Sequence, residues 1–112
     1  MQQGSITPEG HQGFLAKKLF DEMGKIQWGA IAYIEKGGGG PANDHTHSDD
    51  HLFIIADGRV RIVSGDREMF AGKDEAVFVE GMVPHSIWNA GEETAVVIKI
   101  STAQASGGER LR

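Results

Sequence analysis

Short apolar runs rich in β-branched and aromatic residues occur between residues 26 and 101, and polar turn residues separate them. Such runs are typical of strands, where successive side chains point to opposite faces, and along 26–35 residues of both parities are apolar. A less marked run at 14–20 is either a short strand or a helical turn, and a strand is favoured. The pattern predicts strands at 14–20, 26–35, 52–56, 59–63, 67–70, 75–80, 85–88 and 94–101.

Turn-forming residues separate these runs at short intervals. Asp57-Gly58 is a strong hairpin signal, and further turns are expected at 64–66, 72–74 and 89–91. Short strands divided by turns every eight to twelve residues or so are typical of an all-β sandwich or barrel.

The strands belong to one domain. We expect an irregular N-terminal segment over 1–13, a single β-barrel domain over 14–103 and a C-terminal tail over 104–112. The run 36–41, four glycines followed by Pro41, is expected to be a flexible loop. A phosphate-binding loop would need a following Gly-Lys-Ser/Thr and a helix, and both are missing from the pattern.

Composition narrows the function classes. The 112 residues carry a net charge of −5 without a block of lysine or arginine, which argues against nucleic acid as a partner. The absence of cysteine excludes disulfides, thiolate ligands and cysteine catalysis. No apolar stretch approaches the roughly 20 residues of a membrane helix. We expect a soluble, cytoplasmic protein that binds neither nucleic acid nor membrane.

Four histidines are candidate metal ligands. His45, His47 and His51 fall within seven residues, and His45 and His47 share one face of an extended strand. If the strand that starts at His51 folds back beside the first, His51 faces the same interior, where His85 is expected to join it. Converging imidazoles are typical of a transition-metal site. The fifth histidine, His11, is interpreted as a solvated residue of the N-terminal segment.

The spacing of these residues resembles that of the cupin superfamily. The first cupin motif, G-x5-H-x-H-x3,4-E-x6-G, matches from Gly39 through His45 and His47 to Gly58, with His51 in the place of glutamate. The second motif, G-x5-P-x-G-x2-H-x3-N, is matched more loosely. Its positions fall on Gly72, Gly81, His85 and Asn89, with no proline and one extra residue before the histidine.

The resemblance implies a jelly-roll β-barrel that holds one divalent metal ion with His45, His47, His51 and His85. Manganese, iron, nickel, copper and zinc all remain candidates. Cupin ligands leave about two coordination positions open for water or substrate. The superfamily contains dioxygenases, decarboxylases, isomerases and lyases, and the sequence does not choose among them.

Four neutral imidazoles leave the full charge on the ion, which favours a small, anionic, oxygen-rich ligand. Strand parity predicts that the inward-facing apolar side chains around the ion form the pocket wall: Trp28, Ala30, Ala32, Phe53, Ile55 and Ile87. Asp44, Asp49 and Asp50 either orient the imidazoles or keep the loop soluble. Tyr33, Glu35 and Glu80 are candidate acids or bases, and the sequence assigns none of them that role.

The leading hypothesis is a small metal-dependent enzyme that acts on such a metabolite, with oxygen as a candidate co-substrate. A non-catalytic module that binds a sugar or carboxylate is the first alternative, and an accessory domain of a larger pathway is the second. We also expect a homodimer, because pairing of N-terminal strands between two copies would cover open sheet edges. The apolar faces of 14–20 and 94–100 fit such an interface.

Overall fold

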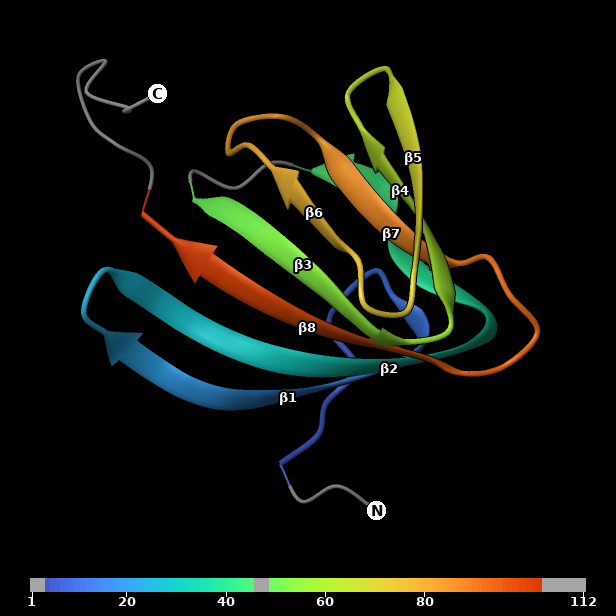
Figure 1. The fold of residues 1–112 in the computed structure, drawn as a ribbon, viewed down its shortest axis with the longest axis horizontal. Helices are drawn as coiled ribbons and strands as arrows, with labels where there is room; N and C mark the ends of the chain where they lie inside the picture. Colours follow the sequence, from blue (N-terminus) through green and yellow to red (C-terminus); the bar gives the residue numbers. More distant parts are fainter. Residues whose placement is uncertain (1–3, 46–48, 104–112) are drawn as a thin grey trace.

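The computed structural model describes residues 4–45 and 49–103, without the side chains of 42–45. These residues form eight strands and no helix (Figure 1). Among the described residues, no segment could therefore cross a membrane as a helix. The strands are β1 (Gln12–Met23), β2 (Ile26–His45), β3 (Asp50–Asp57), β4 (Arg59–Ser64), β5 (Arg67–Gly72), β6 (Ala76–Val79), β7 (His85–Asn89) and β8 (Ala95–Thr102).

The strands build a jelly-roll β-barrel, and this confirms the predicted fold class. All pairings are antiparallel, and the strand order is β5-β4-β7-β2-β8-β3-β6. β1 pairs with the first part of β2 at the edge opposite β8. The long strand β2 belongs to both halves of the barrel: its first part pairs with β1 and β8, and its last part pairs with β7. Figure 1 shows β2 curving around the molecule between these neighbours.

The core lies between the two halves. Along β3, His51, Phe53 and Ile55 are all at most 2% exposed, and the intervening residues are more open, as strand parity predicts. Together with the other buried apolar side chains they form one cluster. Its remaining members are Phe14, Ala32, Ile34, Val60, Ile62, Ala71, Val79, Ile87, Ala95 and Val97.

The expected glycine loop is wrong, because residues 36–41 continue strand β2. Gly39 and Gly40 have φ values of +148° and +147°, which other residues rarely adopt. A Cβ on Gly39 would lie 2.5 Å from the Ile87 carbonyl oxygen and 2.6 Å from Trp88 Cε3. The glycines therefore let β2 bend from β8 towards β7 and allow β7 to pack closely against its backbone.

The expected Asp57-Gly58 hairpin is also wrong, although both flanking strands form. β3 pairs with β6 and β8, whereas β4 pairs with β5 and β7, so this turn carries the chain from one half of the barrel to the other. The strand that starts at His51 also does not fold back beside the strand of His45, because β8 lies between β2 and β3 in the sheet. A two-residue turn permits a hairpin, but the tertiary fold chooses the pairing partner.

The segment before β1 folds back along the barrel. Ile6 forms an isolated bridge with Ala16, whose two backbone hydrogen bonds measure 2.7 and 2.8 Å. The chain then turns at Pro8 and enters β1 at Gln12. The predicted tail, 104–112, lies outside the described residues.

Candidate functional site

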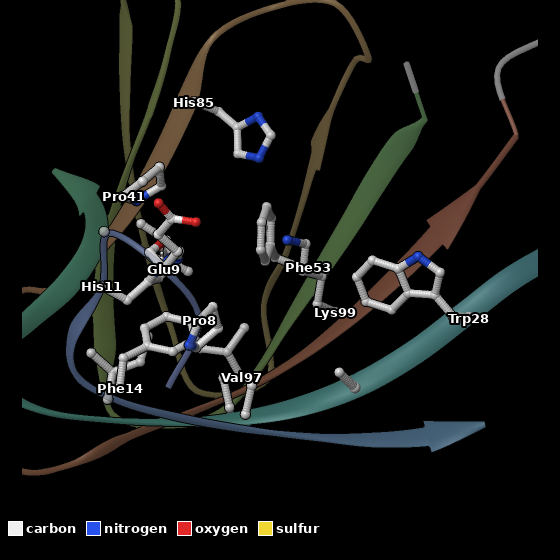
Figure 2. A pocket seen from close by; sticks show the side chains of 16 residues that line it. Pro8, Glu9, His11, Phe14, Trp28, Pro41, Phe53, His85, Val97 and Lys99 are labelled. Carbon is white, nitrogen blue, oxygen red and sulfur yellow. Dashed lines mark hydrogen bonds between the residues drawn. The ribbon is translucent and has the colours of Figure 1, made fainter. Parts of the chain in front are cut away.

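The interior of the barrel holds a cavity of about 270 Å³ (Figure 2). Side chains from β1, β2, β3, β7 and β8 form its wall, and the segment before β1 contributes to it as well. Most of these residues are apolar. The cavity is lined by Pro8, Glu9, His11, Phe14, Ala16, Trp28, Ala30, Ala32, Ile34, Gly40, Pro41, Phe53, His85, Ile87, Val97 and Lys99.

Two of the predicted metal ligands meet inside the barrel. His51 is 2% exposed and His85 is 5% exposed, and their ring centroids lie 5.2 Å apart. His51 comes from β3 and His85 from β7, which belong to different halves of the barrel. Trp28 and Phe53 surround the pair, with ring centroids 5.9 and 6.3 Å from that of His51. The pair is buried beside aromatic rings.

The other two predicted ligands are described only in part. The backbone of His45 is the register partner of His85 across β2 and β7, and its side chain lies outside the described residues, as does all of His47. Within the described residues, no group of three or more His, Cys, Asp or Glu side chains is placed to hold a metal. Two buried imidazoles at this separation fit a transition-metal site as part of a donor set.

Backbone and hydroxyl groups fix the neighbourhood of these histidines. His85 Nδ1 lies 3.3 Å from the Val83 carbonyl oxygen, a contact in which Nδ1 can act as the donor. Asp50, 5% exposed, accepts a hydrogen bond of 2.7 Å from the Gly81 backbone N–H. Asp49 accepts one of 3.2 Å from the Ser101 hydroxyl. These two hydrogen bonds connect the start of β3 with β8 and with the turn between β6 and β7, so both carboxylates have a structural role beyond keeping a loop soluble.

Five of the six residues predicted as pocket wall line the cavity. Trp28 and Ala30 come from β2, Phe53 from β3 and Ile87 from β7. Ala32, on the same face of β2, lines it too. Ile55 does not, because it lies fully buried in the core beyond Phe53.

None of the candidate acids or bases, Tyr33, Glu35 and Glu80, lines the cavity. Tyr33 alternates with the inward-facing Ala32 and Ile34, so it lies on the outer face of the sheet. Glu35 and Glu80 are exposed.

Sequence reasoning missed Lys99, which projects into the cavity from the middle of β8. Its Nζ lies 5.5 Å from the ring centroid of Trp28 and 5.6 Å from that of Phe53 (Figure 2). Burial lowers the pKa of the Lys99 ammonium from 10.5 to about 8, because the charged form loses hydration. The signal in the sequence is a single charge within an otherwise apolar strand.

The interpretation of His11 as a solvated tail residue is wrong. His11 lines the cavity, is partly buried, and packs edge-on against Phe14 with ring centroids 4.5 Å apart. Its Nδ1 lies 2.9 Å from the Glu9 carbonyl oxygen, and Glu9 also lines the cavity. The N-terminal segment folds over the barrel because Ile6 pairs with β1, a contact between segments that local sequence does not reveal.

The structure is similar to several solved structures. One is a predicted oxalate decarboxylase from Thermotoga maritima (TM-score 0.76, 16% identity, 88% of this chain and 90% of that chain). Another is the polyketide cyclase RemF from Streptomyces resistomycificus (TM-score 0.72, 19% identity, 88% of this chain and 71% of that chain). A third is the cupin domain of Schizosaccharomyces pombe Cnp3 (TM-score 0.72, 18% identity, 83% of this chain and 66% of that chain). At these identities the likeness shows a shared fold.

Among curated proteins, none matches the sequence. The family model described as "Cupin domain" matches residues 30–101, well over half of the chain, and this range includes all four predicted ligands. The match agrees with the jelly-roll topology and with the spacing of the histidines and glycines. The chain therefore belongs to the cupin domain family.

Proposed function

We propose that this protein is a metal-dependent cupin enzyme that acts on a small, anionic, oxygen-rich metabolite. The ion would be one divalent transition metal held by His45, His47, His51 and His85. The reaction would be of the dioxygenase, isomerase, decarboxylase or lyase type. The observation that carries the proposal is the pair of buried imidazoles, His51 and His85, beside a cavity of about 270 Å³.

Burial of two imidazoles in an apolar interior is the main physical argument. Imidazole nitrogens are good ligands for divalent transition metals, and one ion can bind two imidazoles from opposite halves of a barrel at once. When Nδ1 of His85 donates to the Val83 carbonyl, Nε2 carries the lone pair that a metal requires. The same hydrogen bond would hold the ring orientation.

Aromatic side chains form the cavity wall beside the two histidines. The rings of Trp28 and Phe53 limit the space beside the histidines and keep that part of the cavity apolar. Such walls strengthen electrostatic interactions with a bound anion, because they exclude water. A bound metal would supply Lewis-acid catalysis or, if redox-active, electron transfer.

Binding without turnover is the alternative. It is favoured by the cavity wall, which has few titratable side chains among the described residues: Glu9, His11, His85 and Lys99. In this case the protein would hold a small sugar or carboxylate as a binding module.

Elemental analysis of untagged protein tests the proposal. We expect about one equivalent of transition metal per chain, and a loss of it in His85→Ala and in His47→Ala, because each removes a ligand. His11→Ala is the matched histidine variant and should keep its metal. A chelator should also lower the melting temperature of wild-type protein, since a metal that binds only the folded state stabilises it.

Wild-type protein that remains metal-free after reconstitution with each candidate metal would overturn the proposal. Equal metal content in wild type and both ligand variants would do the same. A metal-loaded protein that binds small acids but leaves them chemically unchanged in an oxygen-uptake and product screen would favour the binding module. These outcomes separate metal binding from catalysis.

A further inference from the structure

Lys99 is a positive charge in a largely apolar cavity. Of the lysines and arginines in the described residues, Lys99 alone lines the cavity. No Asp or Glu carboxylate of the described residues forms an ion pair with it. A charged group in such surroundings is costly unless an opposite charge joins it. The position therefore suits an anion that arrives with a ligand.

The neighbours of Lys99 leave room for such an anion. Across the sheet, Lys99 is the register partner of Ala30 on β2 and of Phe53 on β3, and all three line the cavity. Ala30 has only a methyl group, so its small size leaves space beside the ammonium. Phe53 and Trp28 provide flat apolar surfaces on either side of Nζ.

The same two rings connect Lys99 to the histidines. Phe53 has its ring centroid 6.4 Å from that of His85, and Trp28 has its own 5.9 Å from that of His51. A ligand whose anionic end meets Lys99 would therefore lay its body along aromatic surface towards the candidate metal ligands. Figure 2 shows His85, Phe53, Lys99 and Trp28 around this part of the cavity.

We propose that Lys99 binds the carboxylate of a small aromatic or unsaturated monocarboxylic acid, whose flat body packs against Phe53 and Trp28. This inference rests on the proposed function, because it concerns the same cavity. It keeps the anionic charge of the ligand proposed above and gives it a flat apolar body in place of an oxygen-rich one, since the wall beside Lys99 is aromatic. A single ammonium neutralises one carboxylate, whereas a phosphate dianion would need further donors in this apolar wall. A dry apolar cavity of about 150 Å³ holds benzene, so about 270 Å³ accommodates a ring with a carboxylate.

Calorimetric titration with benzoate and with its neutral analogue benzamide tests this assignment. Wild-type protein is expected to bind benzoate at least about tenfold more tightly than benzamide. Lys99→Met should weaken benzoate binding by about ten- to a hundredfold and leave benzamide binding unchanged, because it removes one charge-assisted interaction. Lys18→Met is the matched control, since exposed Lys18 shares the register row of Ala30 and Lys99 but does not line the cavity.

Equal benzoate affinity in wild type and Lys99→Met would overturn the assignment and leave Lys99 with a packing role over its two rings. Failure of wild-type protein to bind benzoate at millimolar concentration would overturn it too. Circular dichroism and thermal melting of each variant verify that the barrel is folded.

Titrations with and without a chelator separate this inference from the proposed function. If the protein holds no metal yet loses benzoate binding in Lys99→Met, the proposed function fails and the role of Lys99 stands. If benzoate affinity follows the metal and not Lys99, the role of Lys99 fails and the metal centre stands.

Discussion

Replacing Lys99 by methionine is expected to raise the free energy of unfolding by about 3 kcal/mol at neutral pH. Methionine keeps an unbranched chain against Trp28 and Phe53 but removes the ammonium. A tenfold change in a protonation equilibrium corresponds to about 1.4 kcal/mol, and the pKa of Lys99 falls from 10.5 to about 8 on folding. Keeping the charge in the cavity therefore costs the native state roughly 3 kcal/mol.

The pH dependence follows from the same two pKa values. Below pH 8, Lys99 is charged in both states, so the native state bears the whole cost. Between pH 8 and 10.5 the unfolded chain binds more protons than the native one, and the native state gains stability as pH rises. Above pH 10.5 the lysine is neutral in both states. The advantage of Lys99→Met should therefore be largest at neutral pH and disappear above pH 10.5.

Urea unfolding of wild type and variant, in chelator and at several pH values, measures this difference. Comparing the two proteins at each pH cancels the titration of groups that they share. Lys18→Met, which removes an exposed charge, should change stability by less than about 0.5 kcal/mol at every pH. A stability gain that does not vary with pH, or a loss at neutral pH, would refute the argument that the Lys99 ammonium is held in a desolvated cavity.

Two further predictions concern the fold and its assembly. Gly39→Ala should destabilise the barrel by about 3 kcal/mol or more in denaturant unfolding, because its φ of +148° and the close Ile87 carbonyl both oppose a Cβ. Gly37→Ala, with φ +81° and no atom nearby, should cost only about 1 kcal/mol, and equal losses would contradict the packing argument. We also propose a homodimer through the outer face of β8, where Ile98→Lys should yield a folded monomer by light scattering. Arg67→Glu, on exposed β5, should leave the dimer intact, and a wild-type monomer would contradict the proposal.

The outer face of β8 explains why sequence reasoning missed Lys99. Val96, Ile98 and Ile100 point outward and are partly exposed, whereas the inward row contains Lys99 and Ser101. Hydropathy alone would bury the first row, because it is the more apolar one. The apolar outer row is also what a second copy of the chain would cover, which supports the dimer proposal.

Local sequence determined much of the fold. Apolar runs between turn-forming residues located the strands from β3 to β8, because β-branched and aromatic side chains favour extended backbone. The two-residue period of side chains along a strand correctly paired His51 with Phe53, and His85 with Ile87, on inward faces. The histidine and glycine spacing indicated the cupin family, which the family model confirmed.

Tertiary structure decided which strands pair and what the cavity contains. The glycines at 38–40 continue β2 because β7 and the N-terminal segment pack against their backbone, and Asp57-Gly58 joins two halves of the barrel because β3 and β4 each pair with other strands. His11 reaches the cavity through the pairing of Ile6 with β1. These outcomes depend on contacts between segments far apart in the chain, which a local pattern of side chains does not encode.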